Sequence, residues 1–152
     1  MNLRKLTACI LSIVVLSAVP AHAEGPTVQL TISGPGLDAP LHTSEESVLS
    51  ANVWSGNYVD WGAGPQDTAE DEALDYHVHF WVRPPEGPIQ ISYFLRYRWD
   101  DEANRAILCI PGRRDVWHGL NVASVYRGNE GGCFYAKEEW GAAVRAALTG
   151  EE

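Results

Sequence analysis

Cysteine, methionine and basic side chains are scarce in this chain of 152 residues. It has three Cys, one Met, and 11 Lys and Arg against 20 Asp and Glu, for a formal net charge of −9. Such an acidic chain repels phosphate backbones and anionic membrane surfaces, so we expect neither nucleic acid nor lipid headgroups as partners. The composition is not that of a disordered chain, because 45% of the residues are hydrophobic and six are Trp.

Long apolar runs and enzyme motifs are also missing. Beyond residue 23 no apolar stretch approaches the roughly 20 residues that a membrane-spanning helix needs, so we expect no integral membrane segment. The sequence contains no G-x-S-x-G nucleophile motif and no H-x-x-x-H metal motif. We therefore predict no cofactor and assign no catalytic residue, and the sequence argues against an enzyme.

Residues 1–23 contain the three parts of a secretory signal in order. Arg4 and Lys5 give a positive start, an apolar run follows, and residues 21–23 form an A-x-A cleavage site. We predict a signal peptide at 1–23 and a single exported globular domain at 24–152, in the periplasm or outside the cell. Cleavage would remove 23 residues and two bases, which leaves 129 residues with 20 acids against 9 bases.

Two cysteines, Cys109 and Cys133, lie outside the leader. In an oxidising compartment an even pair of this kind predicts a disulfide. The bridge would close a loop of about 24 residues and stabilise the fold by about 3 kcal/mol.

Alternation of apolar and polar residues predicts a mostly β fold. Residues 27–33 alternate as one half-buried strand, and residues 75–110 read as an antiparallel meander with turns at 84–88 and 100–104. Weaker strands are expected at 47–54, 122–126 and 133–136, and a capping-box pattern at 43–46 predicts one helical turn. A helix is expected at 137–149, where Trp140, Val144, Ala147 and Leu148 form one apolar stripe.

The meander pattern also predicts a register, because a slip of one residue would reverse the two faces. One face should pair Tyr76 with Tyr97, Val78 with Leu95, Phe80 with Tyr93 and Val82 with Ile91. The other should pair Asp75 with Arg98, His77 with Arg96, His79 with Phe94 and Trp81 with Ser92, and should also carry Leu108 and Ile110. We expect the C-terminal helix to cover this second face. The predicted fold is an α+β, mostly β domain: an antiparallel sheet of about five strands, a C-terminal helix and one disulfide.

His77 and His79 are the candidate metal ligands. Residues two apart on a strand point to the same face, so both rings share one side of the sheet. Zinc needs a third ligand, which His118, His42 or an acid of residues 67–75 could supply. Arg96, opposite His77 in the expected register, disfavours a bound cation, so two histidines on a half-solvated sheet face are the more ordinary interpretation. The acids of residues 67–75 read as a solvated loop.

Aromatic residues in expected loops are the candidate binding residues. Trp54, Tyr58 and Trp61 lie in a Gly-rich segment, and Trp117 lies in another. Exposed aromatic rings bind sugars by stacking and proteins as hot spots, but the same rings can instead cover the edges of the sheet. Arg113 and Arg114 in the second segment could bind an anion or a carboxylate, or remain solvated.

One sequence resemblance covers most of the expected mature chain. The segment LTISGPGL at 30–37, then Pro40, a Trp-Gly loop, the Tyr-rich meander, IPG at 110–112 and Trp140 resemble a family of uncharacterised secreted bacterial small-domain proteins. The resemblance implies a bacterial exported domain, and it implies no activity and no functional residues.

These features favour an exported, non-catalytic binding protein. Its strong negative charge would attract a basic protein, such as a secreted enzyme or toxin that it inhibits or neutralises. One alternative is a carbohydrate- or peptidoglycan-binding module that uses the loop Trp residues. The other is a metal-dependent hydrolase that uses His77 and His79.

Overall fold

The computed structural model describes residues 25–65, 75–121 and 128–150. The expected signal peptide at 1–23, most of the acidic segment at 67–75 and the short strand expected at 122–126 lie outside these residues. They therefore stay predictions.

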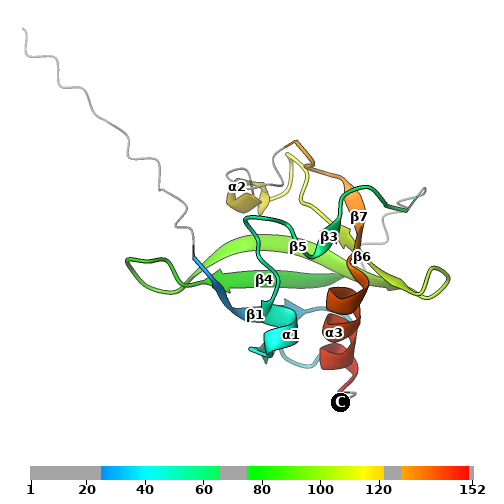
Figure 1. The fold of residues 1–152 in the computed structure, drawn as a ribbon, viewed down its shortest axis with the longest axis horizontal. Helices are drawn as coiled ribbons and strands as arrows, with labels where there is room; N and C mark the ends of the chain where they lie inside the picture. Colours follow the sequence, from blue (N-terminus) through cyan, green and yellow to red (C-terminus); the bar gives the residue numbers. More distant parts are fainter. Residues whose placement is uncertain (1–24, 66–74, 122–127, 151–152) are drawn as a thin grey trace, which may run out of the picture.

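A seven-stranded antiparallel sheet forms the centre of the described fold (Figure 1). Its strands lie in the order β2-β1-β4-β5-β6-β7-β3. They span Thr27–Ser33 (β1), Leu41–Thr43 (β2), Val59–Asp60 (β3), Tyr76–Val82 (β4), Gln90–Asp100 (β5), Arg105–Cys109 (β6) and Cys133–Ala136 (β7). The two shortest strands, β2 and β3, form the edges, which leaves little unpaired edge for another chain.

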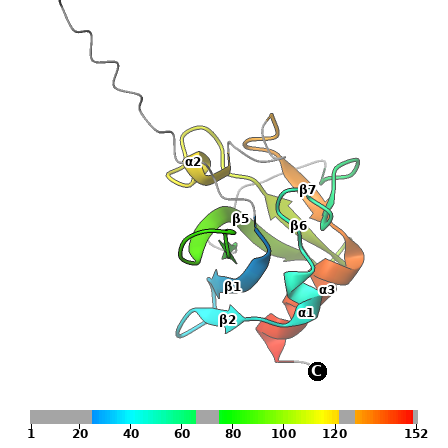
Figure 2. The ribbon, with the colours of Figure 1, turned by 60° about the vertical axis from the view of Figure 1, so that its left-hand side comes forward.

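The helices lie on opposite sides of this sheet. The helices α1 (Glu46–Leu49) and α3 (Glu138–Thr149) cover one side, and α2 (His118–Asn121) lies beyond the other (Figure 1). Figure 2 shows α1 and α3 side by side, in agreement with their contact. We call the side toward α1 and α3 the core face and the opposite side the loop face.

The hydrophobic core lies between the core face and the two helices. Trp140 of α3 is at its centre, with its ring 4.8 Å from that of Tyr58 and 6.2 Å from that of Phe80. The Trp140 Nε1–H donates to the carbonyl oxygen of Val48 at 2.9 Å, and the hydroxyl of Tyr97 donates to that of Gly141 at 2.9 Å. These two bonds tie α1, α3 and the sheet together while they satisfy buried polar groups.

The predicted register of β4 and β5 is confirmed along most of its length. The observed pairs are Tyr76–Tyr97, His77–Arg96, Val78–Leu95, His79–Phe94 and Phe80–Tyr93. The prediction is wrong beyond this point, because Trp81 pairs with Ile91 and Val82 with Gln90. A bulge at Ser92 places one extra residue in β5, and alternation alone does not reveal such an insertion.

The fold class, the C-terminal helix and the disulfide are confirmed, but the strand number is seven rather than about five. The additional edge strands have only two or three residues each, too few to show a period of two. The strand expected at 47–54 is wrong. Its first residues belong to α1, and the side chain of Asn52 then accepts from the backbone N–H groups of Trp54 and Ser55 and closes a turn.

The helix α3 covers the face opposite to the one expected. Leu108 pairs with Tyr97 and therefore lies in the core, together with Ile110, whereas Ile107 and Cys109 lie on the loop face. The β5–β6 turn sets this register, and Asn104 adopts a left-handed φ of 51° within it. The sequence pattern of β6, RAILCI, is apolar at both phases and leaves the choice of face open.

Candidate functional site

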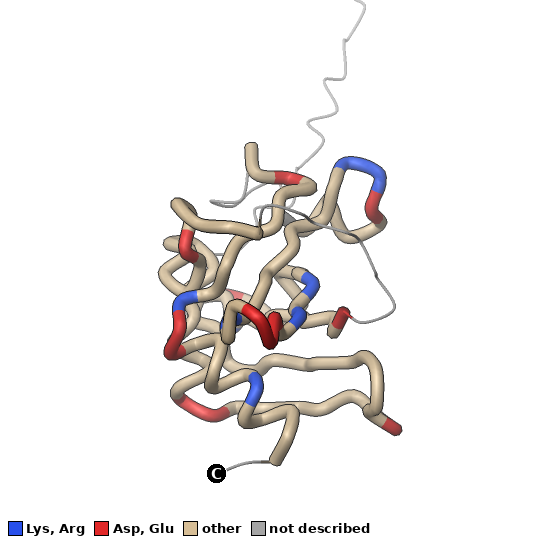
Figure 3. Tube along the Cα trace, turned by 90° about the vertical axis from the view of Figure 1, so that its right-hand side faces the viewer, with Lys and Arg blue, Asp and Glu red and all other residues tan. Residues whose placement is uncertain are grey.

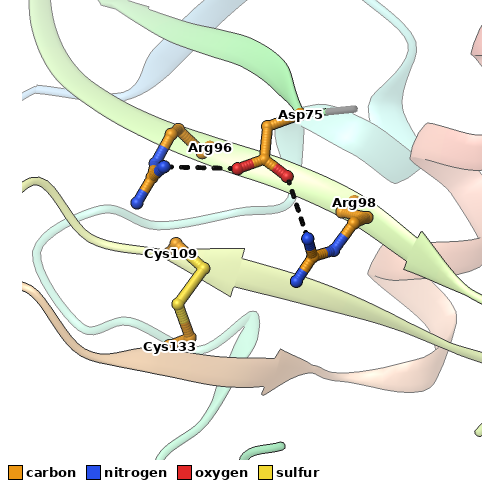
Figure 4. Close-up of a disulfide and its surroundings, with 5 residues drawn as sticks. All are labelled: Asp75, Arg96, Arg98, Cys109 and Cys133. Carbon is orange, nitrogen blue, oxygen red and sulfur yellow. Dashed lines mark ion pairs between the residues drawn. A yellow bond between two sulfur atoms is a disulfide. The ribbon is translucent and has the colours of Figure 1, made fainter. Parts of the chain in front are cut away.

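The disulfide predicted between Cys109 and Cys133 joins the directly opposed residues of β6 and β7 on the loop face. Beside it, Asp75 lies between two guanidinium groups, 3.4 Å from Arg96 and 3.8 Å from Arg98 (Figure 4). The side chain of Asp75 is only 5% exposed, so this carboxylate requires the two cations to be stable there. Arg96 pairs with His77 on one side and with Cys109 on the other, so the disulfide and the ion pairs lie next to the two candidate histidines.

His77 and His79 both lie on the loop face, as predicted, on either side of Phe94. The ring centroids of His77 and His79 lie 5.3 and 5.1 Å from that of Phe94. Burial, and secondly the charge of His77, lower the pKa of His79. Across the described residues no group of three His, Cys, Asp or Glu is placed to hold a metal ion. His42 interacts with Thr31 Oγ1 at 3.1 Å, and Asp75 is held by the two arginines.

The aromatic residues expected as binding anchors are largely packed against the protein itself. Tyr58 is 2% exposed and belongs to the core. Trp54 is half-buried against Tyr93 and donates to the carbonyl of Gly25 at 3.2 Å, and half-buried Trp61 packs on Phe134. Tyr58 fills the core, and the two tryptophans pack against the protein itself, which leaves little surface of the three rings for sugar stacking.

Trp117 and the two arginines of the second segment have different environments. The Trp117 ring is half-buried and stacks on Phe94 at 5.2 Å, and it meets His79 edge-on at 4.8 Å. Arg113 and Arg114 are exposed and form no ion pair with any described residue. The segment 113–115 forms the loop tip drawn blue, blue and red at the upper right of Figure 3. Val116, between the arginines and the anchored ring, is 88% exposed.

A pocket of about 220 Å³ lies on the other side of the molecule, between α1, the segment before β3 and the start of α3. It is lined by Ser47, Ser50, Asn57, Tyr58, Lys137, Glu139 and Trp140. The side chain of Asn57 links two backbone groups near the pocket. Its amide nitrogen donates to the carbonyl of Ser50 at 3.0 Å, and its amide oxygen accepts from the N–H of Asn52 at 2.7 Å. The pocket therefore has a polar wall held in place and an aromatic wall made by the core.

Lys137 and Glu139 give the pocket lining one charge of each sign, and the neighbouring residues make the surrounding segments negative. Glu45 and Glu46 directly precede Ser47, and Glu138 precedes Glu139, so three further exposed carboxylates flank the lining residues along the chain. The positive end of the α3 dipole, roughly half a charge, is smaller than the two carboxylates in its first turn. The Lys137 charge acts on Asp60, whose pKa is lowered mainly by its hydrogen bond with Arg105 and also by Lys137.

Sequence reasoning missed both the pocket and Val116. The paired acids at 45–46 and 138–139 are visible in the sequence. The pocket-lining residues next to them are about 90 positions apart, however, and they meet only because α1 packs on α3. A single apolar residue in a loop carries no sequence signal of exposure.

Comparison of the chain with models of protein families, with curated proteins and with solved structures found no match. The resemblance to uncharacterised secreted bacterial small-domain proteins therefore stays a prediction. None of the helices in the described part of the chain is long and apolar enough to cross a membrane. The disulfide fits an exported protein, since such bonds persist in oxidising compartments.

Proposed function

We propose that this protein is an exported binding protein that recognises a basic protein and docks one of its Lys or Arg side chains in the pocket between α1 and α3. The pocket itself carries the proposal: about 220 Å³ of space with Glu139 in its wall and three further exposed carboxylates flanking it along the chain. Ser47, Ser50 and Asn57 add oxygen acceptors for an ammonium or guanidinium group. A secreted enzyme or toxin that the protein inhibits is one partner of this kind.

Two physical features support such recognition. The net negative charge would attract a basic partner from a distance, and the Glu139 carboxylate in the pocket wall would pair with the bound cation at contact. The pocket wall is preorganised, because Trp140 is hydrogen-bonded to Val48 and Asn57 to two backbone groups. Less conformational freedom is then lost on binding.

The test is an NMR titration of the protein with an arginine-rich peptide and with a citrulline-containing peptide of the same length. The arginine peptide should shift the backbone signals of the pocket residues, and the neutral peptide should not. In the variant Glu46→Gln/Glu139→Gln we expect binding about 2-fold to 30-fold weaker, since exposed ion pairs contribute about 0.2–1 kcal/mol each.

A charge-matched control separates the pocket from net charge. Glu86→Gln/Glu102→Gln removes the same charge from the two hairpin turns, where both side chains are exposed. This variant should bind the arginine peptide nearly as well as the wild type does. Equal weakening in both double variants would show that only the overall charge matters, and the pocket would then have no role.

A further inference from the structure

We infer that the tip of the loop 112–118 is a second interaction surface, which fits a protein with an apolar pocket bordered by carboxylates. We call this segment the tip loop. It lies on the side of the sheet opposite to α1 and α3 and carries the opposite charge to the pocket described above (Figure 1). The inference therefore goes beyond the proposed function and does not depend on it.

The apolar residue at the tip of the loop is exposed. Among the described residues, Val116 at 88% and Ile89 at 43% are the exposed large hydrophobic side chains. A scattered exposed apolar residue needs no explanation by itself. Val116 differs because the next residue, Trp117, packs against Phe94 and His79. Of two consecutive apolar side chains, one is therefore exposed to solvent and the other packs on the sheet.

Hydrogen bonds hold the tip loop in a defined conformation. Asp115 organises it: its N–H donates to the Gly112 carbonyl at 2.9 Å, its carboxylate accepts from the Trp117 N–H at 2.9 Å, and its carbonyl accepts from the His118 N–H at 3.1 Å. Consecutive turns of this kind limit the conformations of the loop.

The base of the tip loop is held as well. The disulfide Cys109–Cys133 closes it, and Ile110 exchanges backbone hydrogen bonds with Gly131 and Gly132 at 3.1 and 2.9 Å. Trp117 then fixes the far side of the loop against Phe94. A loop that is already ordered loses less freedom on binding, which is the main requirement for tight recognition by few residues.

The tip of the loop is positively charged. Arg113 and Arg114 are exposed, and the only carboxylate within the tip loop, that of Asp115, accepts a backbone hydrogen bond. Glu130 lies near the base, where its pKa is lowered first by backbone hydrogen bonds and to a lesser degree by His118 and Arg113. Arg114, two residues before Val116 in the chain, thus adds an exposed cation to the same tip of a molecule with a net negative charge.

These features define the partner by its chemistry. Val116 requires an apolar depression, and the guanidinium groups require carboxylates at its border, which arginine can bind in a bidentate manner. Arginine is enriched among the residues that dominate the binding energy of protein interfaces, so the two exposed arginines are the expected anchors and Val116 adds apolar contact area. The partner is therefore a protein surface that is locally acidic around an apolar centre.

The experiment is a selection of random 12-residue peptides displayed on phage against the intact, oxidised protein. The selected peptides are synthesised, and their affinities are measured by fluorescence anisotropy for the wild type and for Arg114→Ala/Val116→Ser. The matched control is Arg83→Ala/Ile89→Ser, which also removes one exposed base and one exposed apolar side chain, at the β4–β5 hairpin. All four side chains are exposed, so both variants should fold, and their NMR spectra would verify this.

We expect the selected peptides to combine Asp or Glu with Leu, Ile or Phe, and to bind the tip-loop variant at least about tenfold more weakly than the hairpin control. No enrichment, peptides without this composition, or equal affinity for the two variants would each overturn the inference. The pocket variant Glu46→Gln/Glu139→Gln should bind these peptides like the wild type. Failure of the tip loop is thereby separated from failure of the pocket.

Discussion

Gly141 shows how one residue decides the fit between α3 and the sheet. A Cβ atom at this position would lie 2.9 Å from the Cβ of Ala106 and 3.3 Å from that of Ala136. Both neighbours are short side chains on strands, so neither can move aside without the backbone. Glycine is poorly suited to a helix interior, and its presence here follows from this close approach.

Gly141→Ala should therefore destabilise the protein, although alanine is the better helix former. Overpacking costs about 1–3 kcal/mol and exceeds the gain in helix propensity of about 1 kcal/mol. The measurement is the free energy of unfolding in urea. Gly119→Ala, in α2 with no atom near the added Cβ, is the control and should be neutral or slightly stabilising. A stabilised Gly141→Ala variant would contradict the packing described for α3.

A second residue-scale lesson concerns the candidate metal ligands. The strand alternation correctly predicted that His77 and His79 share a face and that Arg96 lies opposite His77. It also placed Phe94 opposite His79, and the structure confirms that pair with both histidine rings against Phe94. It did not predict that Trp117 would pack on His79, because that ring comes from a distant loop.

At the scale of elements, the tip loop is attached to the sheet through His79. Burial first, and the charge of His77 second, lower the pKa of His79 below its ordinary value of 6.5. The folded state therefore favours the neutral ring. Its contribution to stability is complete above pH 6.5, the unfolded value, and is lost as the pH falls through that value toward the folded pKa.

We predict that acidification weakens the wild type more than it weakens His79→Phe, which cannot be protonated. The measurement is the free energy of unfolding in urea at about pH 7.5 and at about pH 5, where the ordinary histidine pKa lies between the two values. His42→Phe, at the exposed position of β2, is the control and should keep the acid sensitivity of the wild type. An identical pH dependence for His79→Phe and the wild type would show that protonation of His79 does not cause the loss of stability in acid.

The elements themselves were predictable where their signal is local. The strands β1, β4 and β5 carry a period of two and the helix α3 a period of 3.6, whereas β6 and β7 are short apolar runs next to turns; the structure confirms all six elements. The short strands β2 and β3 and the turn at Asn52 were not predicted, because their conformations depend on neighbours and on single hydrogen bonds.

At the scale of the whole molecule, the disulfide joins β6 to β7, the two strands at the ends of the chain segment that contains the tip loop. It closes a chain segment of 24 residues, for which the loss of disorder in the unfolded state corresponds to about 3 kcal/mol. Cys109→Ala/Cys133→Ala should therefore lower the free energy of unfolding by about that amount, as measured by urea denaturation of the two proteins without reductant. A loss below about 1 kcal/mol would show that the other contacts between β6 and β7 already hold this region together.

The charge of the molecule also belongs to this scale. Acidic positions occur in several separate parts of the trace rather than in one patch (Figure 3). Within residues 25–65, 75–121 and 128–150, the bases in ion pairs with acids are Arg96, Arg98, Arg105 and Arg145. The net charge was evident from composition, but which acids remain without a nearby base is a property of the fold.

Local patterns were enough to predict the mostly β class, the meander and most of its register, the C-terminal helix and the pairing of Cys109 with Cys133. These follow from local periodicity and from the number of cysteines, which require no knowledge of distant contacts. Long-range packing placed α3 on the face that carries Tyr97 and buried Leu108 there. It also brought Ser47 and Glu139 into one pocket and left Val116 exposed. The reason is physical: periodicity states that one face is apolar, but a turn residue, a bulge and the close approach at Gly141 determine what covers that face.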